Sequence, residues 1–243
     1  MTPAADWLLP DWPAPARVKA CVTTRAGGVS LPPFDTFNLG DHVEDDLQAV
    51  THNRQCLSAR IECSPAWLRQ VHGVVVADAD PAIVAEADAS WTAQTGVACA
   101  VLTADCLPVL FCDRAGSRVA AAHAGWRGLA AGVLEATLAA LAVPASEVLV
   151  WLGPAIGPQA FEVGGEVRDV FLADHPQAAS AFVPSANAGR FMADIYALAR
   201  LRLAACGVTA VYGGGFCTVT DPRFYSYRRA ARTGRFASLV WLD

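Results

Sequence analysis

Residues 96–113 read GVACAVLTADCLPVLFCD, and this stretch decides the fold. It contains two apolar runs of strand length, residues 96–103 and 107–112, which only three residues separate. Short apolar runs that end at polar residues are typical of buried strands, and no helical pattern lies between these two. Consecutive strands do not fit a uniform alternation of strand and helix. The stretch therefore predicts one mixed α/β domain in which helices cover the sheets.

The rest of the chain supplies further elements of both kinds. Strands are predicted at residues 16–24, 67–76, 118–125, 148–153, 208–215 and 235–243. Helices are predicted at residues 45–61, with two acids in the first turn, at 128–143, near 166–173 and at 194–207. The helix at 128–143 is expected to be continuous, with an apolar stripe of Leu129, Val133, Leu134 and Leu138. Residues 25–40 form a long loop rich in Gly and Pro, and such loops inside a compact domain are usually functional or mobile.

Composition excludes several classes of protein. Hydrophobic residues make up 54% of the chain and charged residues 17%, which excludes a mainly disordered protein and predicts a sizeable core. The net charge of −5 argues against nucleic acid or an anionic membrane as partner, because both attract clustered cations. Gly, Pro and charged residues interrupt every long apolar segment, and the N-terminal segment does not resemble a secretory signal. We therefore expect a soluble cytoplasmic protein, for which a small-molecule ligand remains open.

The cysteines and the linkers bear on domain organisation. The eight cysteines are scattered in apolar surroundings without a CxxC pair, which predicts mostly reduced core residues rather than a disulfide framework. No internal repeat and no linker rich in Gly, Ser or Pro divides the chain. The sequence therefore predicts one domain over residues 1–243 that begins with an irregular segment at residues 1–16. It leaves the oligomeric state open.

Three candidate metal ligands share one predicted setting. His72, Cys106 and His123 each lie at or next to the end of a predicted apolar strand. Strand ends are where sheet proteins gather catalytic groups, because the scaffold is rigid and the ends are open. Two imidazoles and one thiolate suit zinc, and three protein ligands leave a fourth position for water or substrate. No short-range ligand motif ties the three residues together, so an inert buried thiol and ordinary histidines also explain them.

The same residues allow other chemistries. Cys106 could be a nucleophile that His123 activates and that Asp105 or another polar group orients, as in a cysteine hydrolase or deamidase. A non-enzymatic metal-binding protein also fits, and copper is compatible with two His and one Cys. A multicopper oxidase needs further copper centres built largely from histidine, and five histidines in all cannot supply them. The remaining histidines lie in polar contexts and are expected to be solvated: His42, His52 and His175.

Arginines mark candidate anion sites. Arg25 follows a predicted strand and precedes two glycines, so its guanidinium and exposed backbone N–H groups could converge on a phosphate. Arg127 lies near a predicted helix start, where the dipole favours an anion, although an ion pair with a nearby acid explains it equally well. A basic cluster near the C-terminus is most simply a solvated loop, but it could rim a site that stacks a planar ring. The cluster comprises Arg223, Arg228, Arg229, Arg232 and Arg235 beside Phe224, Tyr225 and Tyr227.

Longer segments carry a family resemblance. The chain contains, in this order, TTRAGGVS, FNLGDHVEDD, RQVHG, ADA, TADCLPVLFCD, AAHAGWRGLAAGV, GPAIGPQAFEVGGEV, GGGFCT and FYSYRR followed by TGR. Together these segments closely resemble the bacterial YfiH-like laccase-domain family, whose members are viewed as purine nucleoside phosphorylases and were formerly named polyphenol oxidases. The resemblance covers residues 18–241, and no metal position departs from the family's pattern.

The resemblance implies both a fold and an activity. The implied fold is a single-domain α/β/β/α sandwich with mixed sheets, similar to the catalytic domain of the cytotoxic necrotizing factor toxins. The implied activity is phosphorolysis of adenosine, inosine and methylthioadenosine, with adenosine deaminase as a side activity and zinc on His72, Cys106 and His123. Purine nucleosides and phosphate would be the partners. Copper remains possible, and oxidase activity is expected to be secondary.

Residue roles follow as hypotheses from the residues and the resemblance together. Cys106 and His123 are expected at the catalytic centre, where Asp105 would accept a hydrogen bond or relay a proton, with a structural turn as the alternative. Arg25 would hold phosphate against the anomeric carbon, where positioning and charge neutralisation supply most of the rate. The expected substrate-binding residues are Asn38, Gln70 and Arg127.

Overall fold

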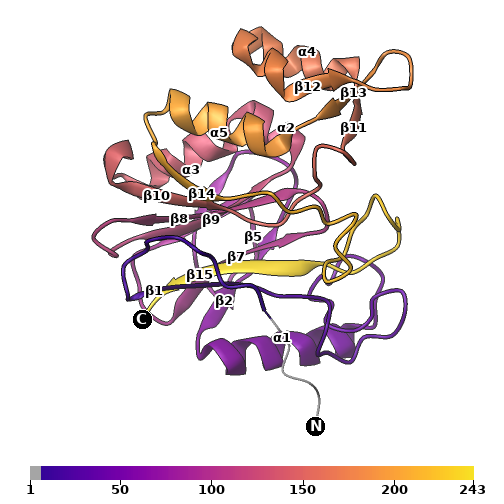
Figure 1. Ribbon diagram of the computed structural model, residues 1–243. Helices are drawn as coiled ribbons and strands as arrows, with labels where there is room; N and C mark the ends of the chain where they lie inside the picture. The colour runs from indigo at the N-terminus through magenta and orange to yellow at the C-terminus, as the bar shows by residue number, and fades with distance from the viewer. Residues whose placement is uncertain (1–6) are drawn as a thin grey trace.

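The computed structural model describes residues 7–243, which form four layers in the order helix, sheet, sheet, helix (Figure 1). Helix α1 (Leu47–Ile61) covers the outer face of a four-stranded sheet. A six-stranded sheet packs on the other face, and α2 (Trp126–Ala131), α3 (Val133–Leu141) and α5 (Ile195–Ala205) cover it in turn. The arrangement confirms the predicted single-domain α/β/β/α sandwich with mixed sheets.

The two central sheets combine parallel and antiparallel pairs. The four-stranded sheet has the order β1 (Val18–Val22), β15 (Phe236–Leu242), β7 (Val97–Thr103) and β2 (Ser64–Ala66). The six-stranded sheet has the order β14 (Ala210–Gly213), β10 (Val148–Leu152), β8 (Leu107–Asp113), β9 (Val119–Ala124), β6 (Ala89–Thr92) and β4 (Val76–Asp78). The parallel pairs lie at the sheet edges, between β2 and β7, β4 and β6, and β10 and β14.

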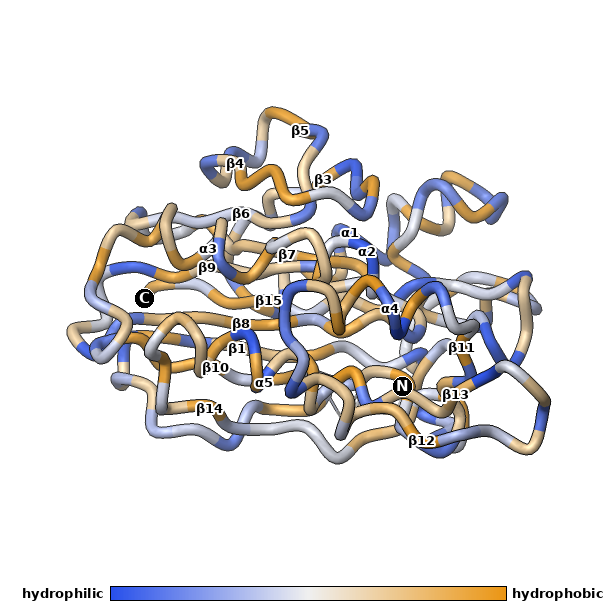
Figure 2. The backbone as a smooth tube through the Cα atoms, turned by 90° about the horizontal axis from the view of Figure 1, so that it is seen from above, coloured by the Kyte–Doolittle hydropathy of each residue, from blue (hydrophilic) through white to orange (hydrophobic). Residues whose placement is uncertain are grey.

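Smaller elements lie outside this stack. A three-stranded sheet has the order β11 (Glu162–Gly164), β13 (Arg190–Ala193) and β12 (Phe182–Pro184). Along the chain, α4 (Gly165–Asp174) and the 3₁₀ helix Pro176–Ala181 connect β11 to β12. A parallel pair of short strands joins β3 (Leu68–Arg69) to β5 (Ala85–Glu86). Figure 2 shows β3, β4 and β5 together at one edge of the molecule. The 3₁₀ helix Ala145–Glu147 precedes β10.

Three apolar cores separate the layers, and the period of two along each strand assigns its side chains to them. On β7, Ala100 and Leu102 pack in the core beneath α1, whereas Cys99 and Val101 pack between the two sheets. On β8 the side chains alternate between the core of the two sheets and the core under the helices. Because both strands are buried on both faces, they read as continuous apolar runs in the sequence.

The stretch that decides the fold crosses from one sheet to the other. Strand β7 belongs to the four-stranded sheet and β8 to the six-stranded sheet, so residues 104–106 connect the two layers. Asp105 turns the chain with a φ of 106°, a conformation that is rare for residues other than glycine. The crossing places Cys106 at the end of the sandwich, immediately before β8. The sequence predicted the two strands but not that they lie in different sheets.

The helix predicted over residues 128–143 is in fact two helices. Gly132 has a φ of 104° and its backbone N–H caps α2, so the chain changes direction before α3 begins. A left-handed residue ends a helix, and glycine adopts this conformation at little cost. The predicted apolar stripe does lie in the core under the helices: Leu129, Val133, Leu134 and the partly buried Leu138.

Two further local predictions are wrong. The first turn of α1 contains no acid, because Asp46 is instead the N-cap, where its side chain accepts the backbone N–H of Gln48. The strand predicted over residues 67–76 ends at Arg69, and the turn that follows carries His72. At both places a carboxylate accepts backbone N–H groups and so competes with regular structure: Asp46 at the start of α1 and Asp88 at the turn that carries His72.

All eight cysteines are free thiols. Half of them are buried in the apolar cores: Cys21, Cys63, Cys99 and Cys112. Burial raises the pKa of Cys21 to about 12, and it does the same for Cys99. These thiols therefore behave as small apolar side chains.

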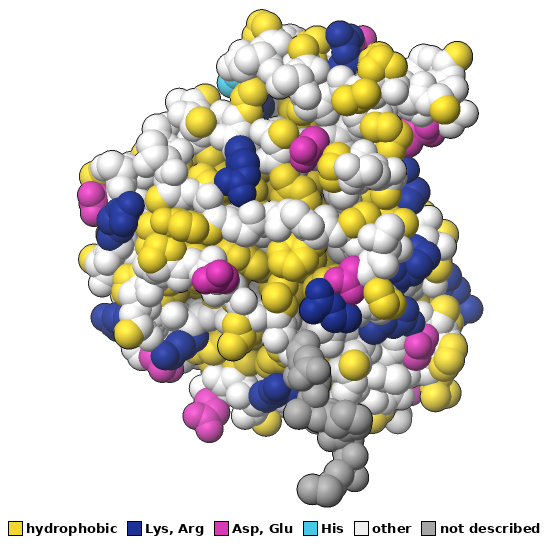
Figure 3. Space-filling model, viewed as in Figure 1, with side chains coloured by type: hydrophobic (Ala, Val, Ile, Leu, Met, Phe, Trp, Pro, Cys, Tyr) yellow, Lys and Arg dark blue, Asp and Glu magenta, His cyan; other side chains and the backbone are white. Residues whose placement is uncertain are grey.

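The surface is uneven in charge. Figure 3 shows Lys and Arg side chains gathered on the side of this face where Figure 1 places the loops between β14 and β15. Those loops contain the predicted basic cluster. Within residues 7–243, no helix combines the length and the apolar character that crossing a membrane requires.

Candidate metal centre

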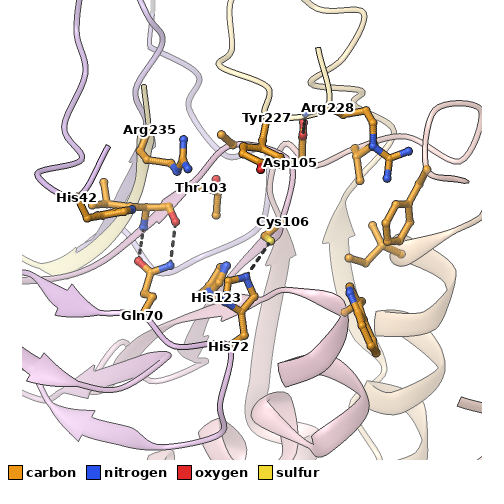
Figure 4. Close-up of a pocket in the computed structure, with 16 residues that line it drawn as sticks. His42, Gln70, His72, Thr103, Asp105, Cys106, His123, Tyr227, Arg228 and Arg235 are labelled. Atoms are coloured by element: carbon orange, nitrogen blue, oxygen red, sulfur yellow. Dashed lines mark hydrogen bonds between the residues drawn. The ribbon is translucent and has the colours of Figure 1, made fainter. Parts of the chain in front are cut away.

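Three candidate metal ligands meet at one end of the sandwich. His72 from the turn after β3, Cys106 before β8 and His123 on β9 place their ligand atoms within 4.8 Å of one another. Nε2 of His72 lies 3.8 Å from Sγ of Cys106, and the two imidazole rings meet edge to face with centroids 4.8 Å apart. Figure 4 shows the three side chains turned toward one another. The fold therefore brings the three predicted ligands together, although they are far apart in the sequence.

A buried carboxylate holds two of these ligands. Asp88 lies directly before β6 and is completely buried. Its Oδ1 lies 2.8 Å from Nδ1 of His123 and accepts the backbone N–H of His72 at 2.9 Å. Its Oδ2 accepts the backbone N–H groups of Val71 at 3.2 Å and Gly73 at 2.6 Å. A carboxylate at Nδ1 fixes the tautomer that presents Nε2 to a metal, so Asp88 positions the cluster.

The electrostatics of the cluster favour an ionised thiol. Burial raises the pKa of Cys106, but the imidazoles of His123 and His72 outweigh burial and lower the pKa to about 6. Burial lowers the pKa of His123, but the Cys106 thiolate and the Asp88 carboxylate outweigh it and raise the pKa to about 9. Burial also raises the pKa of Asp88, yet hydrogen bonds from His123 and from backbone N–H groups hold it below its usual range. A thiolate beside charged imidazole is therefore favoured at neutral pH.

The backbone of Gly125 leaves room for the cluster. This glycine connects β9 to α2, and a Cβ at this position would lie 2.6 Å from Cδ2 of His72 and 3.1 Å from Sγ of Cys106. No side chain can occupy that space unless the ligands move. Glycine is therefore required at residue 125 by close approach rather than by its backbone angles.

The donor set fits zinc. Zinc binds thiolate at about 2.3 Å and imidazole at about 2.0–2.1 Å in a tetrahedral arrangement, which separates neighbouring ligand atoms by roughly 3.3–3.6 Å. The 3.8 Å between sulfur and imidazole nitrogen is close to that separation. The thiol must lose its proton to bind a metal, and its lowered pKa favours that loss. The group can therefore hold a metal ion, and its donor types suit copper as well as zinc.

The cluster forms part of the wall of a cavity of about 390 Å³. A volume of this size is ordinary for a small-molecule site. The other polar lining residues are His42, Gln70, Thr103, Asp105, Arg228 and Arg235. The aromatic lining residues are Trp126, Phe161 and Tyr227. The cavity thus combines flat apolar faces with cationic groups beside the candidate metal centre.

Asp105 and Gln70 line the cavity as predicted, but the protein engages their polar ends (Figure 4). The carboxylate of Asp105 accepts the hydroxyl of Thr218 at 2.6 Å and the backbone N–H of Arg228 at 2.7 Å. The side-chain amide of Gln70 pairs with the backbone N–H and C=O of Leu102, both at 2.8 Å. These bonds fix the cavity wall, which favours the turn role for Asp105 over proton relay.

Two predicted arginines lie outside the cavity lining. The guanidinium of Arg25 pairs with the carboxylate of Asp35 at 2.8 Å and lies over the ring of Tyr225. The side chain of Arg127 is exposed and lies over the ring of Trp126, 4.4 Å from its centroid. The guanidinium of Arg25 is thus paired with an acid of the protein and does not line the cavity, and its expected role in holding a substrate phosphate stays a prediction.

Asn38 is completely buried behind the cavity wall rather than exposed in it. Its Oδ1 accepts the backbone N–H groups of Gly40 at 2.9 Å and Arg235 at 2.8 Å. Its Nδ2 donates to the carbonyl of Gly40 and to the carboxylate of Asp45. All its polar groups are satisfied within the protein, so Asn38 holds the backbone that carries Arg235.

The remaining site residues left only weak signals in the sequence. Asp88 was visible only as an isolated acid before an apolar run. His42 was expected to be solvated, and it is exposed but lines the cavity. Within the C-terminal basic cluster, Tyr227, Arg228 and Arg235 line the cavity, as the rim interpretation predicted. The neighbouring aromatic residues Phe224 and Tyr225 are instead buried between the sheets.

Known proteins match the chain over nearly its whole length. A profile of the family described as multi-copper polyphenol oxidoreductase laccase matches residues 19–243. A Pseudomonas aeruginosa protein named purine nucleoside phosphorylase is 73% identical over 238 residues, which is 98% of each chain. Escherichia coli YfiH, also named purine nucleoside phosphorylase, is 53% identical over 240 residues, 97% of this chain and 98% of its own.

Solved structures agree with the sequence matches. A crystal structure of a Neisseria meningitidis protein superposes with a TM-score of 0.95 at 54% identity, over 98% of this chain and 99% of that chain. The candidate metal ligands and all the cavity residues lie within the residues that the family profile matches. The chain therefore belongs to the multi-copper polyphenol oxidoreductase laccase family, some of whose members are named purine nucleoside phosphorylases.

Proposed function

We propose that this chain is a cytoplasmic, zinc-dependent purine nucleoside phosphorylase that acts on adenosine, inosine and methylthioadenosine, with adenosine deaminase as a side activity. The observation that carries the proposal is the His-Cys-His cluster in the wall of the cavity. The names of the relatives support phosphorolysis as the reaction. The eight free thiols, half of them buried, suit a reducing compartment.

Phosphorolysis exchanges one bond at the ribose. An oxygen of phosphate attacks the anomeric carbon, the bond from that carbon to the base nitrogen breaks, and the base leaves with the bonding electrons. The proton from hydrogen phosphate passes to the base, so the products are free base and ribose 1-phosphate. The enzyme must hold the two reactants in line and offset the charge of phosphate.

His72, Cys106 and His123 would hold the zinc, which supplies Lewis-acid polarisation of a bound substrate atom. Asp88 keeps Nδ1 of His123 engaged, so that Nε2 faces the cavity. The backbone of Gly125 permits the close packing of the ligands. These contacts hold the cluster in place.

The cavity offers a place for the purine and excludes water from part of the site. Trp126 and Phe161 supply flat apolar faces, and the half-exposed Tyr227 stands at the mouth. Aromatic rings stack on planar bases with little dependence on the exocyclic groups. Such recognition suits an enzyme that accepts several purine nucleosides.

The first test is product analysis on protein of known zinc content incubated with adenosine, with and without phosphate. We expect adenine and ribose 1-phosphate only when phosphate is present, and inosine as a minor product in either case. Consumption of adenosine at the same rate without phosphate would contradict phosphorolysis. Cys106→Ser protein serves as the inactive control, because this substitution removes one metal ligand.

A second candidate function follows from the side chains that meet at Cys106. Metal-independent cysteine hydrolases use a nucleophile, a base and an acid that orients the base. Cys106, His123 and Asp88 lie in the matching spatial arrangement. Retention of activity on amide substrates after complete zinc removal would favour this candidate. A copper-dependent polyphenol oxidase has less support than either of these candidate functions, since the five histidines of the chain cannot build further copper centres.

A further inference from the structure

One buried hydroxyl in the cavity wall lacks a partner. Thr103 is the last residue of β7, lines the cavity and is only 2% exposed. Its Oγ1 makes no hydrogen bond to any residue in the described part of the chain. Most buried hydroxyls are paired, so this one, in the cavity wall, is available to a bound molecule or to water.

One cation in the same cavity makes no ion pair with a carboxylate of the described residues. Nη1 of Arg235 donates to the carbonyl oxygens of Thr233 at 2.9 Å and Gly234 at 3.0 Å, which fixes the plane of the guanidinium. Among residues 7–243, no carboxylate lies within 4.0 Å of this guanidinium, and its Nε and Nη2 remain for a ligand. Burial lowers the pKa of Arg235, and the nearby acidic groups of Cys106, Asp105 and Tyr227 oppose this shift without cancelling it, so the charge is held where water only partly solvates it. An anion would complete this environment.

The other cavity cation does not offer the same donors. Nη1 and Nη2 of Arg228 already donate to the carbonyl oxygens of Ala160 and Glu162. The cavity acid Asp105 is occupied as well, by Thr218 and by the backbone of residue 228. Arg235 is therefore the cavity arginine whose Nε and Nη2, on the same edge of the guanidinium, are both available to a ligand. Two parallel N–H groups on one guanidinium match two oxygens of a tetrahedral oxyanion.

We propose that Arg235 and Thr103 form the phosphate subsite of this cavity. The guanidinium would bind two phosphate oxygens, and the hydroxyl of Thr103 would donate to a third. Figure 4 places Thr103 between Arg235 and Cys106, so the subsite adjoins the candidate metal centre. The proposal rests on the proposed phosphorolysis for its ligand, and it assigns to Arg235 the role that the sequence suggested for Arg25.

Asn38 is a positioning residue for this subsite. Its Oδ1 accepts the backbone N–H of Arg235 at 2.8 Å, and its Nδ2 ties the same point to Gly40 and Asp45. A methyl group at Gly40 would lie 2.8 Å from Cγ of Arg235, so the loop of residues 38–40 packs directly on the arginine stem. The loop that precedes α1 therefore sets where the guanidinium lies.

The test compares full-length, zinc-loaded variants by their KM for phosphate in adenosine phosphorolysis. Arg235→Gln removes the charge, Arg235→Lys keeps the charge but removes the fork, and Thr103→Val removes only the hydroxyl. Arg232→Gln is the matched control, because this arginine lies in the same loop but is exposed and stacks on Phe34. Zinc content is measured for each variant to show that the candidate metal centre is intact.

We expect Arg235→Gln to raise the KM for phosphate about tenfold or more and Thr103→Val by roughly threefold to tenfold, with Arg235→Lys between wild type and Arg235→Gln. The KM for adenosine and the Arg232→Gln control should stay within about twofold of wild type. A phosphate KM within that range for both Arg235→Gln and Thr103→Val would overturn the subsite. Thr103→Val nearly preserves shape, so it remains informative if Arg235 variants fail to fold.

A binding measurement separates this proposal from the proposed function. Calorimetric titration with inorganic phosphate needs no turnover, and it is run on the same zinc-loaded proteins. If wild type binds phosphate and Arg235→Gln does not, the subsite stands even where no nucleoside is cleaved. If wild type fails to bind, or if both Arg235→Gln and Thr103→Val bind as wild type does, the subsite is wrong whatever the reaction.

Discussion

Oδ1 of Asp88 lies 2.8 Å from Nδ1 of His123, and both side chains are almost completely buried. The same carboxylate accepts three consecutive backbone N–H groups in the turn that carries His72. One acid thus orients one ligand through its ring and another through its backbone. Asp88 therefore helps to position two of the three candidate metal ligands.

Asp88→Asn is expected to lower zinc affinity by about 10–100-fold, because the amide offers one acceptor where the turn and the imidazole need two. Competition with a zinc-binding dye measures the affinity. Asp113→Asn is the matched control, since Asp113 is also a buried carboxylate that accepts backbone N–H groups, from Ser117 and Arg118, outside the cluster. Equal zinc affinity in the Asp88 variant and wild type would show that the carboxylate does not position the ligands.

Cys106→Ser is expected to lose zinc and phosphorolysis together while the protein remains folded, because a hydroxyl rarely replaces a thiolate ligand. Zinc per chain and activity are measured on the same preparation, and circular dichroism reports the fold. Cys56→Ser serves as the control, because Cys56 is exposed on α1. Full activity in zinc-free Cys106→Ser protein would remove both the metal mechanism and the cysteine-nucleophile alternative.

Gly125→Ala is expected to weaken zinc binding, since the new Cβ would lie 2.6 Å from His72 and 3.1 Å from Cys106. The ligands must move apart, and we expect at least about a tenfold loss of zinc affinity. Gly165→Ala is the control, because a Cβ at the start of α4 has its nearest neighbour at 3.9 Å. Its thermal midpoint should be unchanged or slightly higher, as Ala favours helix. Normal zinc binding by Gly125→Ala would mean that the cluster is looser than the structure indicates.

Alkylation of the zinc-free protein should depend on pH at Cys106. The pKa of about 6 means that the thiolate, which is the reactive form, increases as pH rises through 6 and is largely complete at neutral pH. Below that value the thiol regains its proton and the rate falls. Burial raises the pKa of Cys99 and Cys112 to about 12, so these should stay unmodified in the folded protein. Iodoacetamide labelling followed by mass spectrometry gives the profile, and a midpoint near 9 at Cys106 would contradict the coupling to the imidazoles.

Much of the fold was predictable because burial leaves a direct pattern in the sequence. Strands β7 and β8 are buried on both faces, so continuous apolar runs revealed them. The break between α2 and α3 was not predictable, since a glycine inside a helix costs only about 1 kcal/mol and sequence alone cannot exclude it there. Gly132 ends the helix because its left-handed φ lets the chain turn and pack.

The candidate site was predictable only in part. His72, Cys106 and His123 could be named because few residue types bind zinc and these three lie at or next to the ends of predicted strands. Asp88 could not be named in the same way, since its role comes from contacts with a ring and a turn that are distant in sequence. An isolated acid before a strand looks the same whether it caps a turn or holds a metal ligand.

The sequence by itself determined most kinds of element and the α/β class, because periodicity is a local property. Side-chain chemistry made His72, Cys106 and His123 candidate ligands, and the family resemblance singled them out as a set. The tertiary structure decided which arginine faces the cavity. Arg25 precedes two glycines and looked suited to phosphate, yet the fold gives it Asp35 as a partner. Arg235 looked like part of a solvated cluster, yet the fold places it in the cavity, where no carboxylate of residues 7–243 lies within 4.0 Å of its guanidinium. The effect of a charge depends on what the folded chain places beside it, and local sequence does not contain that information.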